Sequence, residues 1–378
     1  MMGCQEDVTS PTPPEPELAL ATAAVPLAFY QVSAGAGYTC GVTTDNRAYC
    51  WGTGLLGDGS TWNPGTRPVA VAGGLRFHAV SVGNTHACGI TTDNRAYCWG
   101  ENSGGQLGNG TTTNRLRPVL VAGGRRFSQV DAGSSHSCGL SYPDKRAYCW
   151  GTNTDGALGN GTVTRRLTPV AVVGARQFRQ VSAGWNHTCA VTPTDVAYCW
   201  GTNRSGEAGD GSTFNQRLRP VLVAGGLKFR QVDAAYRFTC GVTTSYRAFC
   251  WGDGRSGQMG NGKNDVYRKP TAVAGGLRFD RVTAGSAHAC GETTNNRAYC
   301  WGSNTRGGVG DGSRLNQRLT PVAVVGGLFF SQVSAGSFYT CGRTAEGKAY
   351  CWGDNLSGEL GDGTTTERST PTAVAGPM

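Results

Sequence analysis

The stretch Cys40-Gly-Val-Thr-Thr-Asp-Asn-Arg-Ala-Tyr-Cys50-Trp51-Gly52 decides the fold, because similar stretches recur seven times along the chain. Each copy begins with a cysteine, has a second cysteine ten residues later (eleven in the third copy) and ends in Trp-Gly. The copies lie 48 to 51 residues apart. A period of this length is typical of a propeller, a solenoid or another array of similar units.

Each copy has the pattern of a β-hairpin, because β-branched and aromatic residues flank a short run of turn formers. Two cysteines ten residues apart lie opposite each other only if the loop between the strands has an odd length. A three-residue loop usually places its last residue in the left-handed region. Five copies have a residue there that tolerates this conformation, whereas the fifth copy has Tyr246 and the third copy is one residue longer. The five residues are Asn46, Asn94, Asp195, Asn296 and Gly347.

In this register, the two cysteines of each copy form a cross-strand pair whose separation suits a disulfide. Buried free thiols are the alternative. A zinc site fits less well, because Cys-x9-Cys is not a usual zinc spacing and one hairpin supplies only two ligands. Paired cysteines in every repeat favour an oxidising compartment. We predict disulfides that join Cys40 to Cys50, Cys88 to Cys98, Cys138 to Cys149, Cys189 to Cys199, Cys240 to Cys250, Cys290 to Cys300 and Cys341 to Cys351.

Each repeat from residue 29 onwards contains four strand candidates, here called a to d. Strand a is Phe-x-x-Val followed by small or polar residues, as in 29–35. Strands b and c form the hairpin, and strand d resembles Pro-Val-x-Val-Ala-Gly, as in 118–123. Four antiparallel strands in each of seven units predict an all-β, seven-bladed β-propeller over residues 29–378. If a blade combined strands b, c and d with strand a of the next repeat, residues 29–35 would close the ring.

The composition limits the possible classes of protein. The formal net charge is +9, and residues 1–28 hold no Lys or Arg and four acids, so the other 34 basic and 21 acidic residues give the body +13. The longest apolar run, 18–29, is too short to span a bilayer. No phosphate-binding, nucleophile-elbow or zinc-protease motif is present. We therefore expect no enzyme, no cofactor and no metal.

Residues 1–28 have the composition of an N-terminal linker. Gly-Cys4, followed by polar and acidic residues, resembles the end of a bacterial lipoprotein signal, in which the cysteine is lipidated. No basic and apolar regions precede Cys4. Either the true start codon lies upstream, or Cys4 is an incidental thiol. A lipid on Cys4 would be the route to a membrane.

The segments 99–111 and 184–188 carry Trp-Gly-x-Asn, Gly-Gln-Leu-Gly-Asn-Gly-Thr and Gly-Trp-Asn-His-Thr. These motifs resemble the regulator of chromosome condensation repeat family, and the likeness covers residues 29–376. The resemblance implies a seven-bladed propeller. In the founding member, nucleotide exchange depends on a wedge inserted in one blade, and no repeat here has an insertion longer than one residue. Secreted bacterial members include an enzyme-inhibitory protein that binds through loops on one propeller face, and this secreted or lipoprotein-like bacterial type is the nearest analogy.

Successive strands of a blade run in opposite directions, so successive connections lie on opposite faces of the propeller. The b–c and d–a connections form one face, called the hairpin face, which is rich in arginine and includes Arg47 and Arg95. The a–b and c–d connections form the other, called the long-loop face. Its candidate binding residues are Trp185, Phe214, Tyr236, Arg237, Tyr267 and Phe338. Aromatic residues and arginine are enriched in binding hot spots, and the alternative is that these rings fill the channel mouth.

Four of the five histidines occupy one repeat position, which Tyr or Phe fills in the other copies; they are His86, His136, His187 and His288. This replacement indicates packing rather than metal binding. We expect a monomeric, non-enzymatic scaffold, secreted or in the cell envelope, that binds a protein partner rather than a nucleic acid. The alternatives are a basic-face binder of nucleic acid or acidic glycan, and a hydrolase or lyase in the channel.

Overall fold

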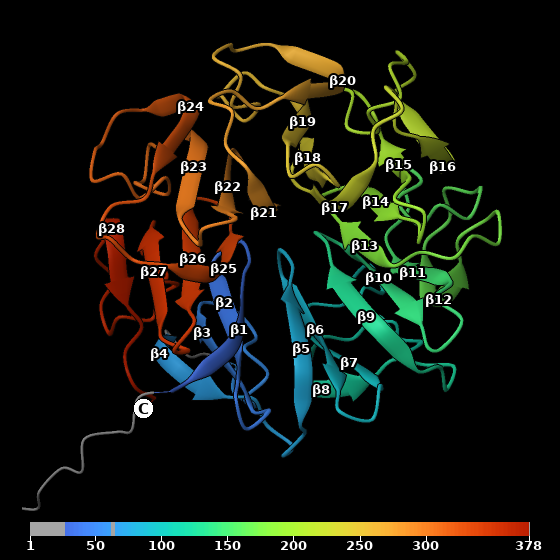
Figure 1. Cartoon of the computed structure of the whole chain (residues 1–378). Helices are drawn as coiled ribbons and strands as arrows, with labels where there is room; N and C mark the ends of the chain where they lie inside the picture. Colours follow the sequence, from blue (N-terminus) through green and yellow to red (C-terminus); the bar gives the residue numbers. More distant parts are fainter. Residues whose placement is uncertain (1–26, 62–64, 378) are drawn as a thin grey trace, which may run out of the picture.

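The computed structural model describes residues 27–61 and 65–377, so Cys4 and nearly all of the expected linker lie outside the described residues. The described residues form seven four-stranded antiparallel sheets around a central channel (Figure 1). This is the predicted seven-bladed propeller. None of the described residues forms a helix long and apolar enough to cross a membrane.

Each blade uses one repeat, with its strands in sequence order from the channel outwards. Blade 1 comprises β1 (Phe29–Ala34), β2 (Tyr38–Thr43), β3 (Ala48–Gly52) and β4 (Gly65–Ala70). The next three blades are β5 (Phe77–Val82), β6 (His86–Thr91), β7 (Ala96–Gly100), β8 (Arg115–Leu120); β9 (Phe127–Ala132), β10 (His136–Ser141), β11 (Ala147–Gly151), β12 (Arg166–Ala171); and β13 (Gln180–Ala183), β14 (His187–Val191), β15 (Ala197–Thr202), β16 (Gln216–Leu222). The last three are β17 (Phe229–Ala234), β18 (Phe238–Thr243), β19 (Ala248–Asp253), β20 (Val266–Ala272); β21 (Phe279–Ala284), β22 (His288–Thr293), β23 (Ala298–Ser303), β24 (Gln317–Ala323); and β25 (Phe330–Ala335), β26 (Tyr339–Thr344), β27 (Ala349–Gly353), β28 (Arg368–Ala373).

The ring does not close by strand exchange. The expectation that 29–35 would complete the last blade is wrong, because β1 pairs with β2 of its own repeat and blade 7 has all four of its strands. Side chains close the ring instead. Gln332 exchanges two hydrogen bonds with the backbone of Val32 (3.0 and 3.1 Å), and the Ser334 hydroxyl accepts one from Ala34 N (3.0 Å).

The same bonds join the other blades around the channel. A glutamine two residues after the first Phe of strand a exchanges paired bonds of 2.7–3.1 Å with a valine of the next blade at five junctions. Ala79 and Arg281 replace it at the other two. Two residues further on, a Ser, Thr or Asp accepts a backbone N–H of the next blade at all seven junctions. These bonds fix the channel wall.

The hairpins have the predicted register. Cys40 lies opposite Cys50, and the other six pairs match in the same way. All seven are disulfides, with Cα atoms 4.0–4.1 Å apart. The last loop residue has a positive φ in each copy, and Tyr246 adopts +66° although it is bulky.

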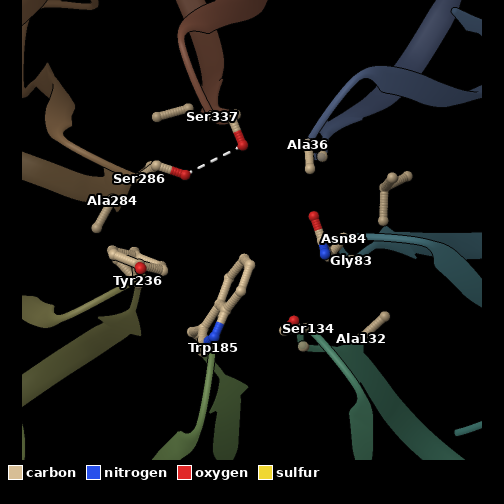
Figure 2. Close-up of a pocket in the computed structure, with 18 of the residues that line it drawn as sticks. Ala36, Gly83, Asn84, Ala132, Ser134, Trp185, Tyr236, Ala284, Ser286 and Ser337 are labelled. Atoms are coloured by element: carbon tan, nitrogen blue, oxygen red, sulfur yellow. Dashed lines mark hydrogen bonds between the residues drawn. The ribbon is translucent and has the colours of Figure 1, made fainter. Parts of the chain in front are cut away.

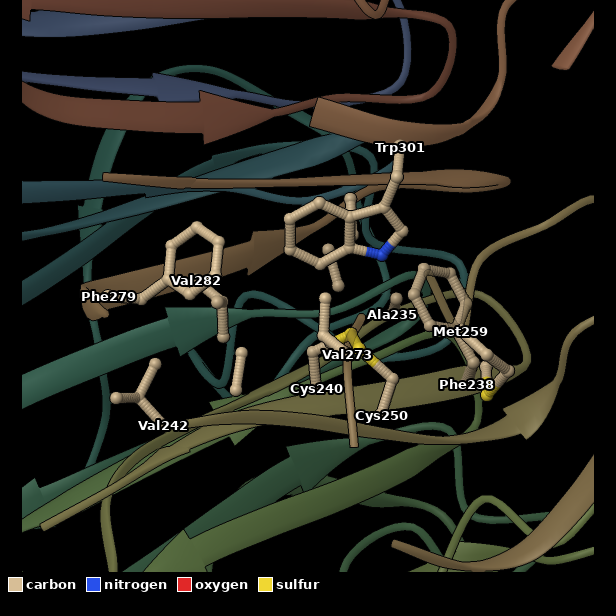
Figure 3. Packing of buried hydrophobic residues seen from close by; sticks show 13 residues of the cluster. Ala235, Phe238, Cys240, Val242, Cys250, Met259, Val273, Phe279, Val282 and Trp301 are labelled. Atoms are coloured by element: carbon tan, nitrogen blue, oxygen red, sulfur yellow. A yellow bond between two sulfur atoms is a disulfide. The ribbon is translucent and has the colours of Figure 1, made fainter. Parts of the chain in front are cut away.

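The hydrophobic core lies between neighbouring blades. Figure 3 shows the disulfide Cys240–Cys250 of blade 5 close to Trp301 and Phe279 of blade 6. The Trp301 indole N–H donates to the carbonyl of Gln258 in the preceding blade at 2.8 Å, so a residue that is fully buried keeps its polar atom paired. A blade therefore shares its core with its neighbour and cannot bury its faces alone.

Removing one disulfide is expected to cost stability. The double replacement Cys290→Ala/Cys300→Ala should lower the free energy of unfolding by about 2–3 kcal/mol, because a closed loop of about ten residues constrains the unfolded chain. Denaturation midpoints of the variant and the native protein measure this loss. Nonreducing peptide mapping should recover the seven within-hairpin pairs, and fourteen free thiols in protein from its native compartment would contradict the prediction.

Candidate binding site at the channel mouth

The a–b turns of all seven blades meet on the long-loop face, where they line a shallow cavity of about 100 Å³. Nearly all of the lining residues are Gly, Ala or Ser. Trp185 and Tyr236 are the large exceptions, and Figure 2 shows both rings projecting into the mouth from adjacent blades. The mouth is therefore bordered by two rings on one side and by small residues on the other.

Trp185 and Tyr236 contact each other. Their ring centroids are 4.7 Å apart at an interplanar angle of 81°, an edge-to-face arrangement. Trp185 follows β13, and its backbone N–H donates to the Ala235 carbonyl at 3.0 Å, which fixes the loop of blade 4 against that of blade 5. The side chains are 37% and 39% exposed, so a pre-ordered aromatic pair faces solvent.

Charged groups surround this pair. The Arg237 guanidinium lies 5.9 Å from the Tyr236 ring centroid. On the other side, Asn186 Nδ2 donates to Asp155 Oδ2 at 3.1 Å, and Arg204 pairs with the same carboxylate at 3.7 Å. Burial raises the pKa of Glu207, with a backbone hydrogen bond from Ser205 and the charge of Arg237 opposing the shift. The pair thus has the polar rim that surrounds apolar anchors in binding sites.

The remaining predicted residues are spread more widely. Phe338 is exposed in the a–b turn of blade 7, and Phe214 is 66% exposed in the c–d loop of blade 4, where the Arg217 guanidinium stacks on its ring at 4.7 Å. Leu315 and Leu356 are exposed in the c–d loops of blades 6 and 7. Sequence reasoning missed both leucines because it considered only aromatic and charged loop residues.

Tyr267 does not lie in a loop, so that expectation is corrected. It belongs to β20, opposite Gly252, and is partly buried against the core between blades 5 and 6. The c–d loop of blade 5 is shorter than its sequence suggests because β20 begins at Val266. Tyr267 is therefore a half-buried strand residue, and its contact with a partner stays a prediction.

The histidines form a buried ring beneath the mouth. Each Nε2 pairs with a Ser or Thr hydroxyl of the next blade at 2.7–2.9 Å. Burial lowers the pKa values to about 3 for His86 and His187 and to about 4 for His136 and His288. This arrangement agrees with a packing role. The described residues contain no group of three His, Cys, Asp or Glu side chains that could hold a metal ion.

Two carboxylates line the channel below the mouth. Burial raises the pKa of Asp131 to about 6 and that of Asp233 to about 7. Both carboxylates accept a backbone N–H of the next blade at 2.7 Å, from Ala183 and Ala284 respectively, and both accept a serine hydroxyl. These bonds belong to the channel wall, and both side chains are held in structural roles.

Several arginines of the hairpin face already form ion pairs or stack on aromatic rings within the protein. Asp45 pairs with Arg47 at 3.1 Å and with Arg76 at 3.6 Å, and Arg95 pairs with Asp93 at 3.1 Å. Arg125 and Arg176 lie over the rings of Tyr148 and Tyr198 at 4.3 and 4.5 Å. These contacts hold several arginines against the rim itself.

Comparisons with known proteins match the geometry. A family model described as the RCC1-like domain matches residues 66–378, and one described as the regulator of chromosome condensation (RCC1) repeat matches 29–57. The chain is 29% identical over 234 residues to the ultraviolet-B receptor UVR8 of Arabidopsis thaliana, covering 60% of the chain and 41% of the receptor. It is 31% identical over 241 residues to the human E3 ubiquitin-protein ligase HERC2, covering 60% of the chain and 5% of the ligase. The chain thus spans less than half the length of these relatives.

Solved structures show the same fold. Human WBSCR16 superposes with a TM-score of 0.78 at 19% identity, covering 87% of this chain and 94% of that one. Prp20p of Saccharomyces cerevisiae, which was studied for its binding to Gsp1p and histones, has a TM-score of 0.78 at 20% identity, covering 92% and 87%. At these identities, the likeness shows the fold alone.

Proposed function

The chain belongs to the RCC1-like domain family, and from this premise we propose that it is a non-enzymatic scaffold that docks a protein partner on its long-loop face. The observation that carries the proposal is the exposed pair Trp185–Tyr236 at the channel mouth. Tryptophan and tyrosine supply large contact areas at low cost in side-chain entropy, and they dominate binding hot spots.

The shape of the site indicates the kind of partner segment. The rings border a shallow cavity lined by Gly, Ala and Ser, so a protruding apolar side chain can fill the mouth and contact both rings. Arg237 beside the pair suits an acidic residue next to that side chain. Phe338, Leu315 and Leu356 on the same face extend the apolar surface toward blades 6 and 7. In the family, binding to Gsp1p and histones has been studied for Prp20p, which supports protein docking as a use of this fold.

Trp185→Ala and Tyr236→Ala are each expected to cost about 2 kcal/mol or more of binding free energy, since each removes half of the central pair. An affinity pull-down from cell-envelope extract supplies the partner, and calorimetry measures the loss. Stability should change by about 1 kcal/mol, the scale of one edge-to-face contact.

Arg47→Ala on the hairpin face is the matched control and should leave affinity unchanged, because Arg47 already pairs with Asp45. The proposed face is the wrong one if both aromatic variants bind normally while Arg47→Ala and Arg95→Ala weaken binding in a salt-dependent way. A nucleic acid or acidic glycan on the hairpin face would give that second pattern.

The location is part of the same proposal. Seven disulfides support an oxidising compartment, so we propose that the protein lies outside the cytoplasm. A monomer stays a prediction. Lipidation of Cys4 stays a prediction: mass spectrometry of the mature N-terminus, after expression of the full gene in a bacterial host, should find a diacylglycerol-modified cysteine. An unmodified Met1 would refute it.

A further inference from the structure

The junction between blades 1 and 2 departs from the repeat. In blade 2, six residues separate Gly100 from Leu107 in the c–d loop, whereas only three separate Gly52 from Leu56 in blade 1. Both leucines are fully buried, so the core end of the loop is kept. The missing residues are therefore taken from the part that covers the long-loop face between the two blades.

This shortening leaves a buried polar atom without a partner. Trp150 and Trp251 donate their indole N–H groups to the carbonyls of Gln106 and Glu207 in the preceding blade, both at 2.9 Å. Trp99, which faces the short loop, is fully buried, and its Nε1 has no partner among the described residues. Such an atom costs free energy unless something else bonds it.

A second buried group at this junction has also lost its partner. His86 pairs with the Ser137 hydroxyl of the next blade, and Tyr339 pairs with that of Thr39. At the corresponding position Tyr38 meets Ala87, so the Tyr38 hydroxyl has no partner among the described residues. Blade 6 also has an alanine there, Ala289, but it faces Phe238, which carries no hydroxyl.

A cavity of about 440 Å³ lies where the loop residues are missing, within the roughly 300–1,000 Å³ of typical ligand pockets. Among the described residues, its walls come from the a–b turns of both blades and from parts of their c–d loops, and they include Tyr38, Thr53, Leu55, Asn84, Glu101 and Asn114. Ala36 and Asn84 also line the channel mouth, on the side opposite Trp185 in Figure 2. The cavity is thus a separate site that adjoins the proposed docking surface.

The charges of the lining residues indicate which class of ligand the cavity can bind. None of the described residues that line the cavity is Lys or Arg, so phosphates and carboxylates find no counter-charge. Glu101 is exposed, and a single exposed ion pair contributes little in water, which disfavours a simple cation. Hydroxyls, amides and one carboxylate acceptor instead match a neutral ligand that is rich in hydroxyl groups. We propose that this cavity binds a neutral saccharide unit.

The test uses the full-length protein and a panel of glucose, galactose, mannose, N-acetylglucosamine and their methyl glycosides, with glucosamine as a cationic control, measured by saturation-transfer NMR and calorimetry. At least one neutral sugar is expected to bind with millimolar or better affinity. Equal binding of its methyl glycoside identifies the end of a glycan chain as the source, and loss of that binding identifies the free sugar. No binding of any sugar at saturating concentration overturns the proposal, as does binding only of glucosamine, a cation.

Two variants locate the site. Replacing Thr53-Gly-Leu55 by the six residues found at 101–106 restores the repeat, should fill the cavity and should abolish sugar binding, with a higher melting temperature because Trp99 regains a carbonyl partner. Glu101→Gln should weaken binding about threefold, because it replaces a charged acceptor by a neutral one at an exposed position. Asp354→Asn, at the corresponding position of blade 7, should leave it unchanged. Sugar binding that survives loop restoration places the sugar elsewhere and overturns the proposal.

Discussion

Gly285→Ala is expected to lower the free energy of unfolding by about 3 kcal/mol, although it adds a single methyl group. A Cβ at this position would lie 2.1 Å from the backbone oxygen of Gly336 in the next blade and 3.0 Å from Cε1 of His288. The Gly336 oxygen cannot turn away freely, because it accepts the N–H of Ser286 at 3.3 Å. Chemical denaturation of the variant and the native protein measures the loss.

Gly37→Ala is the matched control, since its nearest side-chain atoms lie 3.6 and 3.9 Å away and the change should be close to neutral. The array also contains an alanine at the position of Gly285, namely Ala235. The Tyr236 N–H beside it makes no bond to Gly285 O among the described residues, whereas five other junctions have the corresponding bond. A cost below about 1 kcal/mol for Gly285→Ala would show that this junction accommodates a methyl group, and that the close approach of the Gly336 oxygen is not required.

Short-range rules made most of the fold predictable. The cysteine spacing fixed the hairpin register, and the three-residue loops placed their last residue at positive φ. The chain adopts this conformation even at Tyr246, whose ring lies under Arg230 at 4.6 Å and Arg278 at 5.0 Å. Stacking with two arginines accompanies a backbone conformation that tyrosine rarely adopts. Residue propensity marked this position as an exception, yet its φ is positive, as in the other six copies.

Contacts between blades could not be predicted. Gln31 and Gln332 recur at a fixed position, but sequence alone does not show that their partners are backbone groups of the next blade. For the same reason, the strand pattern suggests ring closure by residues 29–35 and does not suggest closure by the side chains of Gln332 and Ser334. In the candidate site, the alternating strand direction predicted that Trp185 and Tyr236 lie on one face. Their edge-to-face contact could not be predicted, because it depends on the angle between two blades. The cavity between blades 1 and 2 depends on a missing segment. Its sequence signal is the 48-residue spacing of the first two copies, which alone does not show that a cavity results.

The double replacement Arg281→Gln/Glu292→Val is expected to raise the free energy of unfolding by as much as about 3 kcal/mol above pH 7. Arg281 stands where five blades have the bridging glutamine, and the Glu292 carboxylate accepts the Val333 N–H in its place. The other oxygen of Glu292 is buried without a partner. The replacement restores the arrangement of the preceding junction, where Gln231 exchanges two bonds with Val282 and Val242 packs in the core.

The gain depends on pH in a defined direction. Burial raises the pKa of Glu292 from 4.5 to about 7, although the bond from Val333 and the charge of Arg281 oppose the shift, and Asp280 adds to it. Arg343 of blade 7 also faces this carboxylate, and its own pKa is lowered by burial. Between pH 4.5 and 7, the native state holds a proton that the unfolded state has lost, so stability falls as pH rises across this window.

The double variant should lack this fall and should match the native protein below pH 4.5, where both states of Glu292 are protonated. Asp131 and Asp233 also have raised pKa values and contribute a background slope of stability against pH, which both proteins share and which cancels in their difference.

The reciprocal change Gln231→Arg/Val242→Glu, which adds a copy of the pair at the preceding junction, is the control and should create a second fall in stability over the same window. Denaturation midpoints measured from pH 4 to pH 8 test both variants. Parallel curves for the native and double-variant proteins would mean that Glu292 is charged in the folded state at neutral pH, compensated by Arg281 and Arg343, and the expected gain would then disappear.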